Sequence, residues 1–205
     1  QAARRLVPGA TASRVPAGLA EPLRDDGRLL AFDKPSGLLS VPGIGPEKAD
    51  CLVARAQDRW PGARIVHRLD RDTSGVIVLA RDADTHRFLS IEFQERRVAK
   101  RYVAVVAGTV AGDAGEIDLP IRKDLDDPPR QRVCHEHGRP SLTRWRVLER
   151  AADRTRLELR PVTGRSHQLR LHLTAIGHPI LGDDLYGDAG TRDAAPRLLL
   201  HAEQL

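Results

Sequence analysis

The sequence contains few aromatic residues, few cysteines and no long apolar run. Phe, Trp and Tyr together make up 3% of the 205 residues, so we expect a core built mainly of aliphatic side chains. The two cysteines, Cys51 and Cys134, lie far apart in the chain, which argues against a disulfide framework and favours the reducing cytoplasm. No run of about eighteen apolar residues predicts a membrane span, and no segment has the pattern of a secretory signal peptide.

Several common catalytic signatures are also missing. The sequence contains no G-x-x-x-x-G-K-[ST], G-x-G-x-x-G or G-x-S-x-G pattern, so nucleotide-loop and serine-hydrolase functions have no motif support. The nearest approach to a metal-binding pattern is Cys134-His135-Glu136-His137. It lies in a polar segment without a clear fourth ligand, and we expect no metal site there.

Lysine is scarce as well, although the chain is basic. Lysine occurs only at positions 34, 48, 100 and 123, so arginine supplies most of the 33 basic residues, which outnumber 28 acidic ones and give a net charge of +5. Such an excess supports salt-sensitive binding to a polyanion, and arginine suits contacts with phosphates and bases. The alternative explanations are an ordinary, mildly basic soluble protein and the codon bias of a GC-rich genome.

Apolar and alternating runs predict an α+β protein with a mixed, mainly antiparallel sheet and flanking helices. Residues 142–149 and 155–160 alternate on either side of a short turn, which is typical of a β-hairpin. Residues 1–27 lack periodicity and are expected to form an extended lead-in, whereas 122–140 are expected to form a long polar excursion. The predicted strands cover residues 28–33, 76–80, 101–107, 115–121, 142–149, 155–160 and 197–201.

Periodic apolar positions predict three helices. The first covers residues 48–59. The second is capped by Asp82 and extends to Arg97, and the third is capped by Ser166 and closed by Gly177. The side chains expected to face inward are Phe88, Ile91 and Phe93 in the second helix, and Leu169, Leu173 and Ile176 in the third.

The segment HRLDRDTSG at 67–75 places one carboxylate, that of Asp70, among several arginines in a predicted loop. A carboxylate that faces arginine has a lowered pKa and stays ionised, as a nucleophile or a general base requires. The alternative is a solvated loop with a local Arg–Asp pair. The segment therefore supplies a candidate catalytic group and leaves the structural alternative open.

Two further segments carry polar side chains in a suggestive order. TGRSHQLRLHL at 163–173 opens with a glycine loop, and the first turns of the helix after it could hold a phosphate or a base edge. The alternative is a capped amphipathic helix with a solvated polar face. In Lys100-Arg101-Tyr102, the tyrosine could stack on a flipped base or take part in proton transfer, although most strand tyrosines simply pack.

Taken together, these segments resemble the RluA-type pseudouridine synthases. The matching motifs occur in the order of that family across residues 29–205, and the excursion, particularly PPRQRVCHEHGRPSLT at 128–143, is similar to the RluA subgroup. The motifs are FDKPSG at 32–37, HRLDRDTSG at 67–75, KRYVAVVAG at 100–108, TGRSHQLRLHL at 163–173, HPILGDDLYG at 178–187 and RLLLHA at 197–202.

The resemblance implies a fold and a reaction. Members share a mixed sheet whose two halves flank a basic RNA-binding cleft, and they isomerise uridine in RNA to pseudouridine without a metal or an organic cofactor. Residues 28–205 would form the catalytic domain. Residues 1–27 are too short for the S4-type RNA-binding domain that many relatives carry.

The resemblance also implies the roles of individual residues. Asp70 matches the catalytic aspartate, which attacks the sugar, attacks the base or removes a ribose proton; the sequence leaves these three open. Arg165 matches the arginine that pairs with this aspartate. Tyr102 matches the tyrosine that packs on the target base and assists removal of the C5 proton.

Further residues are expected to bind the RNA. Arg68 matches the arginine that fills the space left by the flipped nucleotide, and Leu200 lies where an aliphatic side chain lines the uracil pocket. The remaining candidates, for RNA contact or for support of the site, are His67, Lys34, Gln168 and Arg170.

The resemblance to the subgroup implies large-subunit ribosomal RNA, the tRNA anticodon stem–loop, or both as substrates. We expect a monomer without an obligate protein partner. One alternative is a catalytically silent protein that binds or folds RNA. Another is a uridine-handling hydrolase, although hydrolytic glycosidases usually need two carboxylates and the motif supplies one.

Overall fold

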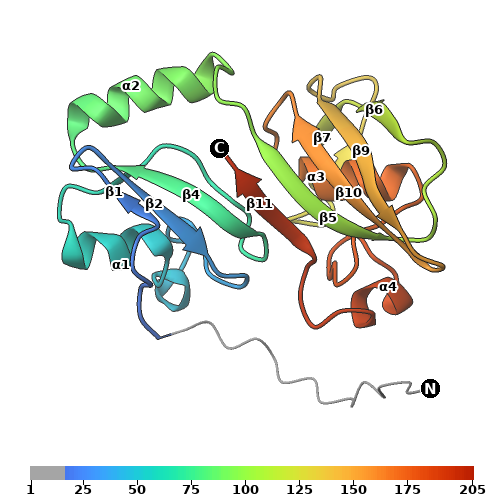
Figure 1. Ribbon diagram of the computed structural model, residues 1–205, viewed down its shortest axis with the longest axis horizontal. Helices are drawn as coiled ribbons and strands as arrows, with labels where there is room; N and C mark the ends of the chain where they lie inside the picture. The colour runs from blue at the N-terminus through green and yellow to red at the C-terminus, as the bar shows by residue number, and fades with distance from the viewer. Residues whose placement is uncertain (1–16) are drawn as a thin grey trace.

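The computed structural model describes residues 17–205 and is organised around a mixed sheet (Figure 1). Within this part of the chain the sheet has 9 strands in the order β1-β2-β4-β11-β5-β10-β9-β6, with β3 paired to β4. Every pairing between these strands is antiparallel except the parallel pair β4–β11, which confirms the predicted fold class. The strands are β1 Arg24–Asp25, β2 Leu29–Lys34, β3 Arg64–Ile65, β4 Ser74–Ala80, β5 Arg101–Ala107, β6 Ala114–Asp118, β9 Leu142–Arg150, β10 Arg154–Pro161 and β11 Leu200–Gln204.

The last strand, β11, joins two halves of the molecule. One half carries β1, β2 and β4, the other carries β5, β6, β9 and β10, and β11 lies between β4 and β5 (Figure 1). Its parallel pairing places Ala202 opposite Gly75. Gly75 has a φ of +116°, and a Cβ there would lie 2.2 Å from the carbonyl oxygen of Ala202. Only glycine allows this close approach, so the end of the motif at 67–75 is part of the joint between the halves.

The core is aliphatic, as the scarcity of aromatic residues predicts. Alternate side chains of β2, β5 and β10 point into it, and α1 (Leu52–Arg59) covers it with Leu52, Val53 and Ala56. The rings of Phe32 and Trp60 meet edge to face at 5.8 Å. No helix in the described part of the chain is long and apolar enough to cross a bilayer.

All three predicted helices differ in detail from the expectation. The first begins at Leu52 and not at residue 48, because 46–48 form a separate 3₁₀ turn and Cys51 is extended. The second, α2 (Ala83–Gln94), is capped by Asp82 as predicted. The expectation that Phe88 and Ile91 face inward is wrong, since they are 62% and 42% exposed. No residue of α2 is fully buried, so the helix lies loosely on the sheet.

The third helix, α3 (Gln168–Ala175), is not capped by Ser166. Its N-cap is His167, which has a left-handed φ of 55° and makes no side-chain capping bond. The carboxamide oxygen of Gln168, the first residue of the helix, accepts the Arg165 N–H and so fixes the loop that leads into the helix. Leu169 and Leu173 are buried as predicted, and Gly177 closes the helix with a φ of +83°. Ile176 is partly exposed, contrary to the expectation.

The remaining differences are in the connections. The polar excursion contains a hairpin of β7 (Ile121–Lys123) and β8 (Gln131–Val133), so the strand expected at 115–121 divides between β6 and β7. The final strand begins at Leu200 and not at 197, and a short helix, α4 (Ala189–Asp193), was not predicted. Of the expected lead-in, residues 1–16 lie outside the described residues, and β1 pairs with β2.

Candidate active site

The predicted motifs meet in a cleft of about 1040 Å³ between the two halves. Its walls come from the loop at 66–73, the segment at 93–102 and the loop and helix at 161–170. Eight of the nine predicted site residues line it, and Arg68 among them is exposed. These eight are His67, Arg68, Asp70, Tyr102, Arg165, Gln168, Arg170 and Leu200.

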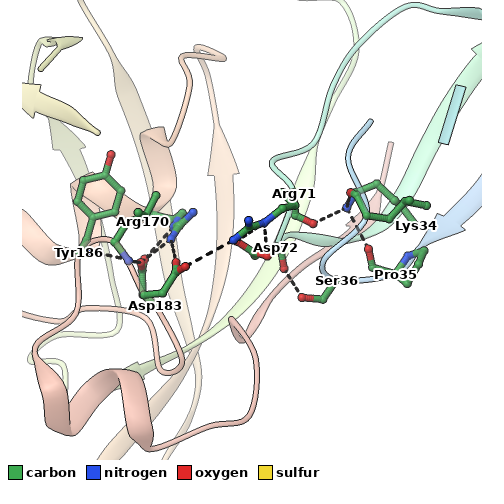
Figure 2. Close-up of polar contacts among 11 residues, drawn as sticks. Lys34, Pro35, Ser36, Arg71, Asp72, Arg170, Asp183 and Tyr186 are labelled. Atoms are coloured by element: carbon green, nitrogen blue, oxygen red, sulfur yellow. Dashed lines mark hydrogen bonds and ion pairs between the residues drawn. The ribbon is translucent and has the colours of Figure 1, made fainter. Parts of the chain in front are cut away.

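The loop that carries Asp70 is fixed on both sides of this residue. On one side, the Ser40 hydroxyl donates to the Leu69 carbonyl oxygen at 2.7 Å and accepts the Leu69 N–H at 3.1 Å. On the other side, the Ser36 hydroxyl donates to the carbonyl oxygen of Asp72 at 2.8 Å (Figure 2). Since the carbonyl oxygen of Asp70 also accepts the Thr73 N–H, the backbone around the carboxylate is held from several directions.

Lys34 lies beneath this loop and outside the cleft. Its side chain is 0% exposed, and its ammonium donates to the carbonyl oxygens of Pro35, Leu38 and Arg71 at 2.7–3.0 Å (Figure 2). Burial lowers its pKa to about 8, against the opposing attraction of Asp72 and Asp70. Of the two roles expected for Lys34, RNA contact or support of the site, these contacts favour support of the loop that carries Asp70.

Tyr102 lies on β5, where it faces the cleft and is 9% exposed. Burial, followed by the nearby charge of Asp70, raises the pKa of its phenol. The hydroxyl is therefore protonated at neutral pH, which favours packing on a base and hydrogen-bond donation over action as a phenolate. Leu200 is buried on the adjacent strand β11 and lines the same cleft.

The ion pair predicted between Arg165 and Asp70 is not formed. Both residues line the cleft, but no carboxylate in residues 17–205 lies within ion-pair distance of Arg165, and its buried Nε has no hydrogen-bond acceptor. The loop that carries Arg165 is held by Gln168, whose carboxamide oxygen accepts the Arg165 N–H at 3.0 Å and the Thr163 hydroxyl at 2.7 Å. Gln168 is itself buried, so of the two roles expected for it, RNA contact or support of the site, its contacts favour support.

Arg170 is also buried and serves as a structural link. Its guanidinium is 2% exposed and forms a paired contact with Asp183, with Nε to Oδ2 at 2.9 Å (Figure 2). It also contacts Asp184 at 3.0 Å, and Asp184 lies 3.6 Å from Arg71 in the loop that carries Asp70. Arg170 thus connects α3 to both halves, which favours the expected role of site support over RNA contact.

His67 is held in its neutral form at the cleft wall. Its Nε2 accepts the Val78 N–H at 3.0 Å, and its ring stacks on Phe93 with centroids 4.5 Å apart. Burial, with a smaller effect of Lys100, lowers the pKa of the imidazole to about 4. A neutral ring that accepts a backbone N–H is a supporting element of the wall.

Two further residues, His167 at the cleft and its contact Tyr186, were not among the nine predicted site residues. His167 has a left-handed backbone, lines the cleft and contacts the Tyr186 hydroxyl through Nδ1 at 2.9 Å. That hydroxyl accepts the N–H of Gln131 at 2.8 Å, which anchors the β7–β8 hairpin beside the cleft. Both residues lie inside the motifs at 163–173 and 178–187, which were the available signal.

No three His, Cys, Asp or Glu side chains among residues 17–205 are grouped so that they could hold a metal ion. In the segment at 134–137, the nearest approach to a metal-binding pattern in the sequence, His137 and Glu136 form an exposed pair.

Comparison with known proteins identifies the family. The RNA pseudouridylate synthase family model matches residues 28–175. The chain is 50% identical to the dual-specificity RNA pseudouridine synthase RluA of Escherichia coli strain K12 over 184 residues, which cover 89% of this chain and 84% of that protein. The protein of the same name from Yersinia pestis is 48% identical, with 89% of each chain covered.

A solved structure with a similar fold carries the name of the same family. The human RNA pseudouridylate synthase domain containing 1 superposes with a TM-score of 0.76 at 30% identity, over 89% of this chain and 76% of that one. The family match covers more than half of the chain, and the relatives extend it to nearly all of the described residues. The chain therefore belongs to the RNA pseudouridylate synthase family and is an isomerase that acts on RNA.

Proposed function

We propose that this protein isomerises a uridine in a structured RNA, with Asp70 as the catalytic carboxylate. The RNA would be large-subunit ribosomal RNA, the tRNA anticodon stem–loop, or both. The similar protein from Escherichia coli is named a dual-specificity enzyme, which supports more than one substrate. The observation that carries the proposal is the position of Asp70, in a cleft, on a loop fixed from both sides and close enough to raise the pKa of the buried Tyr102.

The reaction exchanges one bond for another. The bond from C1′ to N1 breaks, a bond from C1′ to C5 forms, C5 loses a proton to solvent, and N1 gains one. In a stacked helix these atoms are inaccessible, so the nucleotide must be flipped into the cleft at a cost of a few kcal/mol. A loop has already lost part of its stacking, which favours a stem–loop substrate.

The cleft supplies groups for each part of this process. Asp70 would act on the ribose or the base, and the three possible first steps stay open. Tyr102 and Leu200 would enclose the flipped uracil. The neutral Tyr102 hydroxyl would relay the C5 proton, because it would release its own proton to solvent as it takes up that one. Arg68 is exposed at the cleft and would fill the space that the nucleotide leaves. Arg165 would turn toward Asp70 or the RNA when substrate binds.

We further propose residues 28–205 as the catalytic domain of a cytoplasmic monomer that needs no cofactor. The family match begins at residue 28, which supports the first boundary. Sedimentation of the purified protein, with and without a stem–loop RNA, would test the monomer.

The deciding experiment measures tritium release from RNA labelled at uridine C5, for the wild type and for Asp70→Asn. C5 loses its hydrogen only if the base is rejoined through that carbon. We expect release by the wild type, none by Asp70→Asn, and equal RNA binding by both. Ribosomal RNA and transfer RNA are tested separately, so that the substrate is read from the same assay.

Other outcomes would support the rival functions. Free uracil among the products would indicate a hydrolase. RNA binding by folded wild-type protein without tritium release from either RNA would contradict the proposal and favour a binding protein. Tritium release by Asp70→Asn at the wild-type rate would show that the reaction does not need the Asp70 carboxylate.

A further inference from the structure

Lys100 is a cation at the cleft without a partner of opposite charge. It follows the segment that crosses from α2 in one half to β5 in the other (Figure 1), and its half-buried side chain lines the cleft. Its ammonium lies 5.7 Å from the centre of the Phe93 ring. No carboxylate or carbonyl oxygen in residues 17–205 accepts a hydrogen bond from it, although three donors are available.

The loop after the neighbouring strand β10 leaves room for this ammonium. A Cβ built on Gly164 would lie 3.3 Å from Nζ of Lys100, and Gly164 does not have the positive φ that requires glycine. The missing side chain therefore leaves space and does not relieve backbone strain. The next residue, Arg165, also has a buried Nε without an acceptor. Two unpaired cationic donors thus lie in neighbouring segments, one just before β5 and one just after β10, and both line the cleft.

The carboxylates of the cleft, Asp70 and Asp72, form no ion pair with Lys100 or Arg165, and the charged group that acts on Lys100 is positive. Burial, followed by the charge of Arg96, lowers the pKa of Lys100. Arg96 is exposed and lines the same cleft. His67, which stacks on Phe93, is neutral at physiological pH, because burial lowers its pKa to about 4. An anion is the ligand that such a cluster lacks.

We propose that Lys100 and Arg165 form a phosphate subsite that binds a backbone phosphodiester of the RNA next to the flipped nucleotide. A phosphodiester carries one negative charge on oxygens that can accept from both residues at once. Contacts of this kind fix the register of an RNA and carry no sequence information. The inference rests on the proposed function, since it takes the cleft to be the RNA site.

The first test measures RNA affinity against salt concentration, with all variants built on Asp70→Asn so that no turnover occurs. Lys100→Met should weaken binding of a stem–loop RNA by about tenfold or more, the loss of a charged hydrogen bond. It should also reduce the slope of log K against log salt by about 0.7–0.9, the contribution of one phosphate contact. Lys100→Arg should keep most of the slope, and Lys123→Met, outside the cleft, should keep all of it.

The second test uses the space at Gly164. Gly164→Ala should push the ammonium of Lys100 aside and weaken binding severalfold. In a Lys100→Met background the atom that the new Cβ meets is gone, so Gly164→Ala should have little further effect. Equal losses in both backgrounds would show that the substitution acts on the Arg165 loop alone and would overturn the paired subsite.

Thermal unfolding of each variant establishes that the fold is intact. An unchanged salt slope in folded Lys100→Met would also overturn the proposal. The tritium assay separates this result from failure of the proposed function. Tritium release by the wild type together with an unaltered salt slope for Lys100→Met would contradict the phosphate subsite alone. A reduced salt slope without tritium release by the wild type would support the subsite and contradict the proposed isomerase activity.

Discussion

The hydroxyl of Ser40 bonds to both backbone groups of Leu69, the residue before Asp70. It donates to the carbonyl oxygen at 2.7 Å and accepts the N–H at 3.1 Å, and it is buried. One side chain from the segment after β2 therefore sets the backbone position of the candidate catalytic residue. A backbone held in this way keeps the carboxylate in place before substrate arrives, which favours catalysis by preorganisation.

Ser40→Ala should destabilise the protein and slow the reaction. The change leaves the buried N–H and carbonyl of Leu69 without a partner, which costs about 1–3 kcal/mol of unfolding free energy. We expect kcat for tritium release to fall more than KM rises, because Asp70 loses its position. Ser166→Ala is the matched control for stability, since Ser166 is exposed and should change it by less than about 0.5 kcal/mol. Wild-type kcat in Ser40→Ala would contradict the role of this contact.

Arg170→Met should be among the most destabilising substitutions. It leaves the carboxylate of Asp183, which is 0% exposed, without its charged partner, at a cost of about 3–5 kcal/mol in urea unfolding. Arg170→Met combined with Asp183→Asn should recover much of this loss. The asparagine removes the charge and can still accept the N–H groups of Leu185 and Tyr186. A double variant less stable than the single one would show that the lost contacts, and not the unpaired charge, dominate.

His67 should make the protein less stable in mild acid. Its folded pKa is about 4 and its ordinary value is 6.5, so between these values the unfolded chain binds a proton that the folded chain does not. The unfolding free energy should therefore fall as pH drops from 6.5 to 4, by up to roughly 3 kcal/mol from this group. His67→Gln should flatten the curve in that window, whereas His137→Gln, at an exposed histidine, should not. Parallel curves for wild type and His67→Gln would refute the assignment.

Tyr186→Phe should loosen the β7–β8 hairpin. The lost hydroxyl accepts the N–H of Gln131 and contacts His167, so we expect a loss of about 1–2 kcal/mol. The phenylalanine ring keeps the position over Arg170, whose Cζ lies 5.4 Å from the ring centre. Hydrogen exchange at the Gln131 amide should speed up. Unchanged exchange at this amide would mean that the hairpin is held by its other contacts.

The sequence alone determined the features that depend on neighbouring residues. The alternating apolar positions of β5 and β10 predicted strands with one buried face, and Asp82 predicted the start of α2. The motif around Asp70 predicted a polar loop before a buried strand, which is what forms. These features depend on backbone geometry over a few residues, so a local pattern is enough to find them.

The tertiary structure alone decided what the long polar side chains do. Lys34, Gln168 and Arg170 are polar enough for RNA contact, yet each is buried against groups from distant segments and supports the site instead. Nothing near Phe88 in sequence shows that the sheet leaves it uncovered. The joining of the halves depends on Gly75 meeting Ala202, which are brought together only by folding. The burial of a side chain and the identity of its partner are set by segments far away in the chain, so a local pattern cannot contain them.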